Sequence, residues 1–227
     1  MQKHAPIPSV GFFSGMPPAL LEELKKIAIE KTFQKGEMIF YEGDKSVGFY
    51  LLLSGLIKIY KLSPEGKEQI LQFIKPNETF GEVVVFSGKI FPAHAEAVKE
   101  SHTLLFPRAD FLEIIRRNPD VALAMLAILS DRLRRFTVQV ENLSLKEVPS
   151  RLATYFLYLY KEEKKGPSLT LEISKGQLAS LLGTIPETLS RVLTRMKEHG
   201  IIEVEGNRID LLDIPQLEAL SSGEKLG

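Results

Sequence analysis

The sequence predicts an α+β protein in three consecutive parts: a β-rich domain over residues 1–118, a long helix with its hinge over 119–146, and a winged helix-turn-helix domain over 147–227. Three observations predict this order. Short apolar stretches recur in the first hundred residues, an apolar repeat of threes and fours follows, and two short helices with a hairpin complete the pattern. A chain of 227 residues is long enough to build two hydrophobic cores.

The first hundred residues predict a small barrel or sandwich of short strands. Glycines and turn-forming residues separate six apolar stretches, which is the spacing of an all-β unit. The stretches cover residues 38–41, 49–53, 56–60, 70–74, 83–86 and 103–106. A helix over 17–29 is expected to precede them, because its apolar side chains fall on one face.

The middle of the chain predicts a helix that pairs with a second copy of itself. A short helix over 109–117 and a break at Asn118-Pro119 come first. The following apolar residues are spaced three and four apart, as in the seam of a coiled coil. They are Leu126, Leu129, Leu133, Phe136, Val140 and Leu143. A stripe this narrow favours packing against a second copy of the helix, in a homodimer. The alternative is an ordinary amphipathic helix that packs against its own domain.

Near the C-terminus, two capping boxes predict the starts of two short helices. Ser174 with Gln177, and Thr184 with Glu187, each match the pattern in which a hydroxyl and a long side chain cap one another's backbone donors. Gly183 lies where the turn between the helices must be tight. Together these features predict a helix-turn-helix.

The second of these helices carries a polar strip that suits the major groove of DNA. The strip consists of Glu187, Ser190, Arg191 and Thr194, and apolar residues occupy the opposite face. We expect Arg191 to donate to guanine O6 and N7, Glu187 to accept from a cytosine amino group, and Ser190 to lie near a thymine methyl. The alternatives are that Glu187 only caps its helix and that Arg191 is a solvated surface charge.

A hairpin around Gly206-Asn207 follows and makes the motif a winged one. We expect Lys175, Thr194 and Arg208 to contact the DNA backbone. All ten arginines lie at or beyond Arg108, and arginine is the preferred bidentate partner for phosphate and guanine. Nucleic acid is therefore expected to bind the second half of the chain.

Residues 12 to about 212 resemble the cyclic-AMP receptor protein and fumarate–nitrate reductase regulator (Crp/Fnr) family. The likeness is carried by Gly43-Asp44 with residues 49–55, by Phe80-Gly81-Glu82, by the helix with the repeat of threes and fours, and by residues 173–192. It implies a cyclic-nucleotide-binding-type β-roll, a dimerisation helix and a winged DNA reader on each protomer. It also implies contact with RNA polymerase if the protein is an activator.

Within that family, residues 186–191 resemble the reader of the oxygen and nitric-oxide branch, whose sites are TTGA-type inverted repeats. The cyclic-AMP branch usually has an arginine where Pro186 stands. The resemblance therefore predicts a TTGA-type site.

The resemblance places an effector pocket at Gly81, Glu82, Pro92 and His94. In cyclic-AMP binders this segment ends in an Arg-Ser or Arg-Thr pair that clamps the phosphate, whereas Phe91 and Pro92 stand there in this chain. Residues 1–107 contain no arginine to replace the clamp, which disfavours cyclic AMP.

The sequence bears on two iron-containing cofactors, an iron–sulfur cluster and haem. The absence of cysteine excludes a cysteine-ligated iron–sulfur cluster. Haem stays open, because residues 91–97 resemble a segment of regulators of nitrosative-stress and denitrification genes, some of which bind haem. His94 and His102 are the candidate ligands in the sensor domain. The effector is thus predicted to be something other than cyclic AMP, or to be absent.

The remaining function classes are an enzyme, a haem-based nitric-oxide or redox sensor of the same fold, and a winged-helix adaptor for proteins. The sequence has no glycine-rich phosphate loop, no nucleophile elbow, no metal-ligand spacing and no paired carboxylates in a recognisable frame, so we expect no enzyme. It contains no apolar run long enough for a membrane span and no signal-peptide pattern, which predicts a cytoplasmic protein without a membrane partner.

Overall fold

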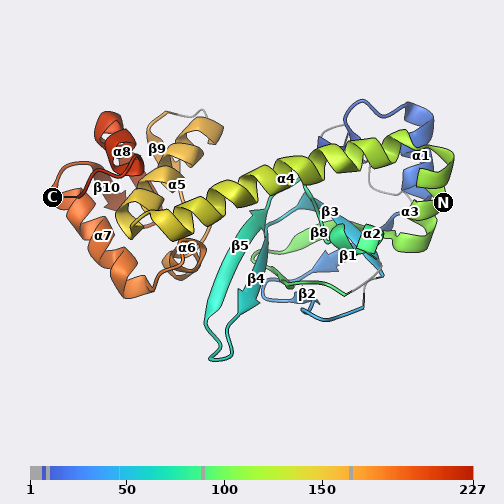
Figure 1. The fold of residues 1–227 in the computed structure, drawn as a ribbon, viewed down its shortest axis with the longest axis horizontal. Helices are drawn as coiled ribbons and strands as arrows, with labels where there is room; N and C mark the ends of the chain where they lie inside the picture. Colours follow the sequence, from blue (N-terminus) through green and yellow to red (C-terminus); the bar gives the residue numbers. More distant parts are fainter. Residues whose placement is uncertain (1–6, 9–10, 46, 88–89, 164–165, 227) are drawn as a thin grey trace. The chain divides into compact units, whose positions relative to one another are not determined.

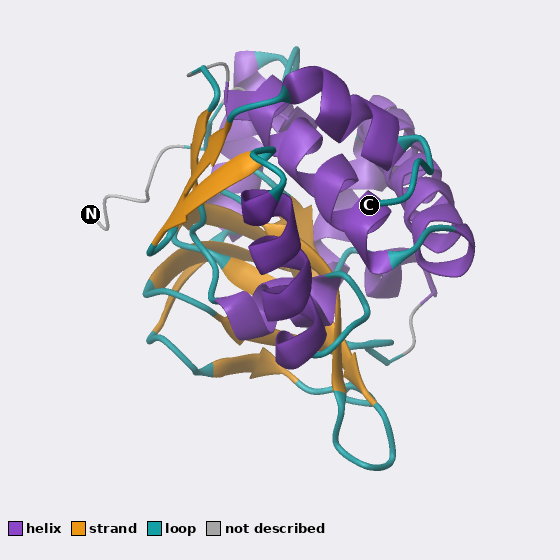
Figure 2. Ribbon diagram, turned by 90° about the vertical axis from the view of Figure 1, so that its left-hand side faces the viewer, coloured by secondary structure: helices purple, strands orange, loops and turns teal. Residues whose placement is uncertain are grey.

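The computed structural model describes residues 7–8, 11–45, 47–87, 90–163 and 166–226. They form two compact units, Met1–Leu133 and Arg134–Gly227. The boundary between the units falls within the long helix α4 (Asp120–Leu145). The predicted α+β class is confirmed, with a β-roll in the first unit and a helix-turn-helix with a small sheet in the second. Figure 2 distinguishes the strands of both units from the helices by colour.

The first unit contains two four-stranded antiparallel sheets (Figure 1). One sheet has the order β1-β8-β3-β6, with bounds Ile29–Phe33, Ser101–Pro107, Gly48–Ser54 and Thr79–Phe80. The other has the order β2-β7-β4-β5, with bounds Met38–Phe40, His94–Ala97, Ile57–Leu62 and Glu68–Ile74. The helices are η1 (Gly11–Phe13), α1 (Pro18–Ile27), α2 (Val83–Ser87), α3 (Arg108–Arg117) and the start of α4.

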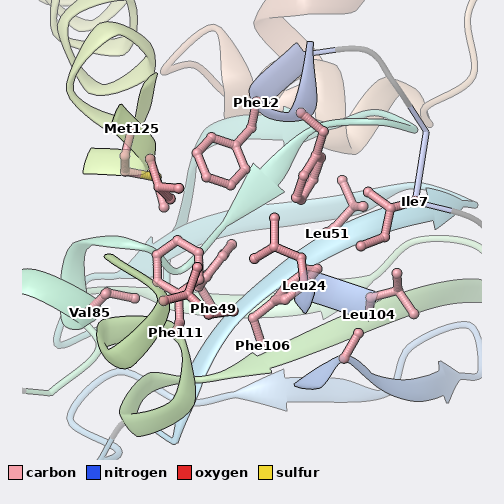
Figure 3. Close-up of a cluster of buried hydrophobic side chains, with 14 of the residues drawn as sticks. Ile7, Phe12, Leu24, Phe49, Leu51, Val85, Leu104, Phe106, Phe111 and Met125 are labelled. Carbon is pink, nitrogen blue, oxygen red and sulfur yellow. The ribbon is translucent and has the colours of Figure 1, made fainter. Parts of the chain in front are cut away.

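Strand β3 is buried on both faces and separates two apolar cores. Phe49 and Leu51 pack with residues of α1, α3 and α4 in the cluster of Figure 3. Tyr50 and Leu52 point the other way, into a second cluster that both sheets contribute to. Because successive side chains of a strand alternate in direction, a continuous apolar run here fills one core beneath the helices and another inside the roll.

Five of the six predicted strand segments are confirmed as β2, β3, β4, β5 and β8. The prediction for residues 83–86 is wrong, because they form α2. Gly81, with φ +75°, ends β6, and the Val85 amide then donates back to the Glu82 carbonyl at 3.0 Å. A short apolar run does not distinguish a buried strand from a buried helical turn by its periodicity. The sequence patterns also missed β1, β6 and β7.

Helix α4 begins after Asn118-Pro119, as predicted, and its first turns pack on the core of Figure 3 through Val121 and Met125. Most of the predicted seam is exposed to solvent. The exposed members are Leu126 at 55%, Leu133 at 68%, Phe136 at 37% and Val140 at 62%. Leu129 and Leu143 are partly buried, and Leu129 packs against the core of its own unit. The seam thus presents apolar side chains that the single chain does not cover.

The second unit contains helices α5 (Val148–Glu163), α6 (Lys175–Leu181), α7 (Pro186–Glu198) and α8 (Ile214–Ser221). Its sheet has the order β10-β11-β9, with bounds Ile202–Glu205, Arg208–Leu211 and Ser168–Thr170. Gly206 and Asn207 form the two-residue turn between β10 and β11, as predicted. Helix α8 was not predicted. Among the described residues, no helix is long and apolar enough to cross a membrane.

Candidate DNA-binding site and effector pocket

The first predicted capping box fixes the start of α6. The Ser174 hydroxyl accepts a hydrogen bond from the Gln177 amide at 3.2 Å, and the Gln177 side chain accepts one from the Ser174 amide at 2.9 Å. Gly183, with φ +64°, makes the turn to the next helix. This backbone conformation favours glycine because it has no Cβ. Both features confirm the predicted helix-turn-helix geometry.

The second predicted capping box is wrong. Helix α7 has Ile185 as its N-cap, with no side-chain cap, and Pro186 follows at the start of the helix. Proline lacks an amide hydrogen and has a fixed φ, so it is accommodated in the first turn. The helix therefore begins one residue later than a Thr184 cap requires. Glu187 lies in the first turn, where its charge is favourable to the helix dipole.

Alanine substitutions of Ser174 and Thr184 test whether each side chain caps its helix. Ser174→Ala removes a side-chain cap that is present and is expected to lower the free energy of unfolding by about 1 kcal/mol. Thr184→Ala removes no cap of α7, so it is expected to change that free energy by less than about 0.5 kcal/mol. Urea unfolding of the two full-length variants measures both. Equal losses would show that Thr184 caps α7 in solution.

The two predicted faces of helix α7 differ in exposure as expected. Its buried residues are Leu189, Val192, Leu193 and Met196. The polar strip of Glu187, Ser190, Arg191 and Thr194 is exposed. The Arg191 guanidinium donates to the Thr188 hydroxyl at 3.2 Å, one turn earlier on the helix. The strip is thus held on a rigid helix whose opposite face is fixed in the core of the unit.

The predicted backbone contacts differ in their surroundings. Lys175 is the first residue of α6 and is exposed. Arg208 on the wing is paired with Asp210, at 3.0 Å from both Nε and Nη2 to Oδ1. Hydrogen bonds from Ser168 and Arg208 lower the pKa of Asp210 below its ordinary value. A phosphate at Arg208 would have to compete with this carboxylate.

Aromatic side chains fill the interior of the roll at the predicted effector pocket. Phe91 is buried and its ring stacks on that of Phe40, with centroids 3.7 Å apart. Phe80 and Tyr50 continue the cluster, with ring centroids 5.1 Å apart. A Cβ on Gly81 would lie 3.0 Å from the Phe91 ring. The residue at the predicted clamp position therefore belongs to the core.

Glu82 is buried and its charge is compensated by an arginine that the sequence reasoning missed. Arg132 on α4 donates to the Glu82 carboxylate and to the Thr79 carbonyl. Glu82 is 2% exposed and Arg132 is 18% exposed. Arg132 follows Met125 by seven residues and so lies on the core-facing side of α4. This spacing could have identified Arg132 as a cation on the core-facing side of α4, although not Glu82 as its partner.

Of the other two predicted pocket residues, His94 points away from the interior of the roll and Pro92 is exposed. Ala95 points into the roll, so its neighbour His94 lies on the opposite face of β7. His94 Nδ1 accepts a hydrogen bond from the Glu42 amide at 3.2 Å, and Nε2 is 3.9 Å from the Glu42 carboxylate. Pro92 is exposed, and its carbonyl accepts from Lys61 at 3.1 Å.

His102, the second histidine considered as a haem ligand, also has a hydrogen-bond partner. His102 Nδ1 is 3.1 Å from the Thr32 hydroxyl, and the side chain is 51% exposed. Within the part of the chain that the structure describes, no group of three or more His, Cys, Asp or Glu side chains could hold a metal ion. Both histidines therefore already have a hydrogen-bond partner at Nδ1.

Two family models match the two units described above. A cyclic nucleotide-binding domain matches residues 30–118, and a Crp-like helix-turn-helix domain matches residues 150–220. A protein of Thermus thermophilus described as a cyclic AMP receptor protein is 31% identical over 211 residues, which cover 93% of this chain and 96% of that protein. The chain belongs to the Crp/Fnr family. Crp/Fnr proteins are transcription regulators, so this is a DNA-binding regulator and not an enzyme.

Relatives from different branches of the Crp/Fnr family match this chain. The transcriptional activator protein Anr of Pseudomonas aeruginosa is 27% identical over 201 residues, covering 87% of this chain and 82% of Anr. The solved structure of FixK2 from Bradyrhizobium japonicum superposes with a TM-score of 0.78 and 26% identity, covering 88% of this chain and all of FixK2. Overall sequence similarity therefore assigns this chain to the family but not to one branch of it. Evidence for a branch has to come from individual residues.

Proposed function

We propose that the protein is a homodimer that reads a TTGA-type inverted repeat with α7 and acts without cyclic AMP. One observation carries the DNA-reading part: Glu187, Ser190 and Arg191 lie together on the exposed strip of a helix whose other face is buried. The resemblance of residues 186–191 to the oxygen and nitric-oxide branch supports the TTGA sequence. Pro186 offers no side-chain donor where the cyclic-AMP branch usually has an arginine.

The exposed seam of α4 supports the homodimer. Leu126, Leu133 and Val140 are each more than half exposed, and they recur with the spacing of a coiled coil. Burial against the same residues of a second copy would remove this apolar surface from water. A dimer of this kind carries two readers, which suits an inverted repeat.

The interior of the roll supports an effector other than cyclic AMP, or none. Phe91 is part of the aromatic cluster and offers no group that binds an anion. The guanidinium nearest to Glu82 is Arg132, which already donates to that carboxylate and to Thr79. A cyclic phosphate would have to displace both arrangements.

Cyclic AMP is therefore expected to leave DNA binding unchanged. The full-length protein is titrated with a labelled TTGA inverted repeat, without cyclic AMP and with about 1 mM of it, which is the upper end of the usual range of constants for small ligands. The two dissociation constants should agree within about twofold, which corresponds to about 0.4 kcal/mol. Tighter binding with cyclic AMP would show that Phe91 moves aside for a ligand. That result would contradict the effector part of the proposal and leave the DNA-reading part standing.

Arg191 is the residue that tests base reading. Arg191→Ala is expected to reduce discrimination between the TTGA repeat and a scrambled duplex by about 1–3 kcal/mol per half-site, because a bidentate bond to guanine is lost. Arg191→Lys keeps the charge but removes the planar fork, so it is expected to lose discrimination as well. Fluorescence anisotropy at one stated salt concentration measures both variants.

Lys161→Ala, which removes an exposed cation from the last turn of α5, is the control for these variants and should discriminate like the native protein. An equal loss of affinity for both duplexes in Arg191→Ala would show that Arg191 contacts phosphate only. No preference of the native protein for the repeat would contradict the proposed site. Binding to a protein partner with no DNA binding would favour the winged-helix adaptor instead.

A further inference from the structure

The residue at the start of the recognition helix α7 is apolar and exposed to solvent. Ile185 is the N-cap of α7 and has an extended backbone, with φ −112° and ψ 155°. Its carbonyl accepts the first hydrogen bond of the helix, from the Leu189 amide at 3.0 Å. Ile185 is 46% exposed. It therefore presents hydrocarbon to the solvent at the N-terminal end of the helix that is proposed to read bases.

Isoleucine is an unfavourable residue for this position. Helix N-caps favour serine, threonine, aspartate and asparagine, because a side-chain oxygen accepts from an amide of the first turn, and isoleucine is among the least favoured residues. The helices before and after α7 follow this preference. Ser174 caps α6 by accepting from the Gln177 amide, and Asp213 caps α8 by accepting from the Gln216 amide at 2.9 Å. The N-cap of α7 departs from the pattern of these two helices.

Packing within the second unit does not explain the isoleucine. Helix α7 is fixed in the core by four buried residues, Leu189, Val192, Leu193 and Met196. Each of them is at most 7% exposed. In a hydrophobic staple the residue before the N-cap packs against the fourth residue of the helix, and that position belongs to Thr184 rather than Ile185. Where a residue departs from a local preference without a matching gain in packing, the reason is expected in the function of the site.

Ile185 adjoins the polar strip of α7. Pro186 and Glu187 follow it directly and are also exposed. Because an α-helix rises by about 1.5 Å per residue, Ile185 lies only about 3 Å along the helix axis from Glu187. A recognition helix directs this N-terminal end at the base edges of the major groove. The exposed hydrocarbon of Ile185 is therefore placed where base edges are read.

Thymine offers an apolar group that matches Ile185. Its C5 methyl is displayed in the major groove, and apolar side chains contact it there. A TTGA half-site has two thymines on one strand and a third opposite its adenine. We propose that Ile185 is a specificity-determining residue that contacts the C5 methyl of one of these thymines. This rests on the proposed function and adds an apolar contact to its hydrogen-bonding residues.

The chemistry of this contact accounts for the choice of residue. Contact between Ile185 and a methyl group removes both hydrocarbon surfaces from water, which is favourable. A serine or threonine at the same position would cap α7 but would place a hydroxyl group against the methyl, which is unfavourable unless the hydroxyl finds a partner. The isoleucine thus weakens the start of α7 and strengthens its reading of thymine.

Deoxyuridine tests the contact, because it differs from thymidine only by lacking the C5 methyl. Each thymine of the half-site is replaced in turn, at the same position in both halves of the repeat. Binding of the full-length protein is measured by fluorescence anisotropy at one salt concentration. At one position the native protein should lose about fourfold in affinity per half-site, the effect of one hydrocarbon group removed from water, and about fifteenfold as a dimer. Ile185→Ser should bind the thymine and deoxyuridine forms of that position equally.

Urea unfolding adds a readout that a packing role would move in the other direction. Ile185→Ser supplies a side-chain oxygen that can cap α7, so the urea midpoint of the second unit should rise although DNA binding weakens. Leu212→Ser is the control, since Leu212 is more than half exposed in the same unit but lies outside α7. We expect this control to respond to deoxyuridine like the native protein.

The outcomes separate this inference from the proposed function. A native protein that is indifferent to deoxyuridine at every position would overturn the thymine contact. An Ile185→Ser variant that keeps the native response would also overturn it, and a lowered urea midpoint in that variant would identify Ile185 as a packing residue. In both cases a native preference for the TTGA repeat leaves the proposed function standing. If the native protein does not distinguish the repeat from a scrambled duplex, the proposed DNA site itself is contradicted.

Discussion

Replacing Arg132 by alanine should destabilise the β-roll by about 3 kcal/mol. The substitution leaves the Glu82 carboxylate buried without its cation and leaves the Thr79 carbonyl without one of its donors. Removing one partner of a buried ion pair typically costs about 3–5 kcal/mol, and the partial exposure of Arg132 argues for the lower end. Urea unfolding of the full chain measures the loss of free energy of unfolding. Hydrogen exchange of the β3 and β8 amides assigns the transition to the roll.

A double variant provides the control for this prediction. Arg132→Met with Glu82→Gln removes both charges while keeping side chains of similar length, so most of the lost stability is expected to return. Comparison of the double variant with Arg132→Ala separates an uncompensated charge from lost packing. Native stability of Arg132→Ala would contradict the description of Glu82 as a buried carboxylate that depends on Arg132.

Placing aspartates at Leu126 and Leu133 should convert the protein into a monomer and weaken its binding to the inverted repeat on the order of 10²–10⁴-fold. Both side chains are more than half exposed in the single chain, so neither substitution opens the core of its unit. In a paired seam each dimer would bury four carboxylates in an apolar interface, which is strongly unfavourable. Loss of pairing makes the two half-sites independent, which removes the gain from simultaneous binding.

Val138→Asp is the matched control. Val138 is on the same helix and is 53% exposed, but it lies two residues before Val140 and so faces away from the seam. We expect this variant to remain dimeric and to bind the repeat with native affinity. Sedimentation velocity gives the association state of all three proteins. A native dimer in the Leu126→Asp/Leu133→Asp variant would place the interface elsewhere.

Elements with an extended periodic pattern could be predicted from the sequence. The repeat around Leu133 and the Ser174 capping box are local signals, because a helix brings together residues three and four apart. The hairpin at Gly206-Asn207 is equally local, since the turn depends on two adjacent residues and Gly206 adopts the left-handed region with φ +61°. The order of the elements and most of helix α7 followed from such patterns.

The errors arose where tertiary contacts decide the outcome. Val84 and Val85 are adjacent, yet each contributes to a different core, which a helical turn permits. Thr184 matched a capping motif, but Pro186 moved the start of α7 past it. Neither the reach of Arg132 to Glu82, fifty residues earlier, nor the outward direction of His94 is encoded in local spacing. The elements of the helix-turn-helix could therefore be predicted from the sequence better than the interior of the roll.

The most direct test is the composition of the complex on DNA. Sedimentation of the full-length protein with a labelled TTGA inverted repeat should give two protomers per duplex, and a duplex with a single half-site should bind far more weakly. Two readers joined along α4 require both results. A complex with one protomer per duplex, bound equally well to the repeat and to the single half-site, would contradict a paired reader.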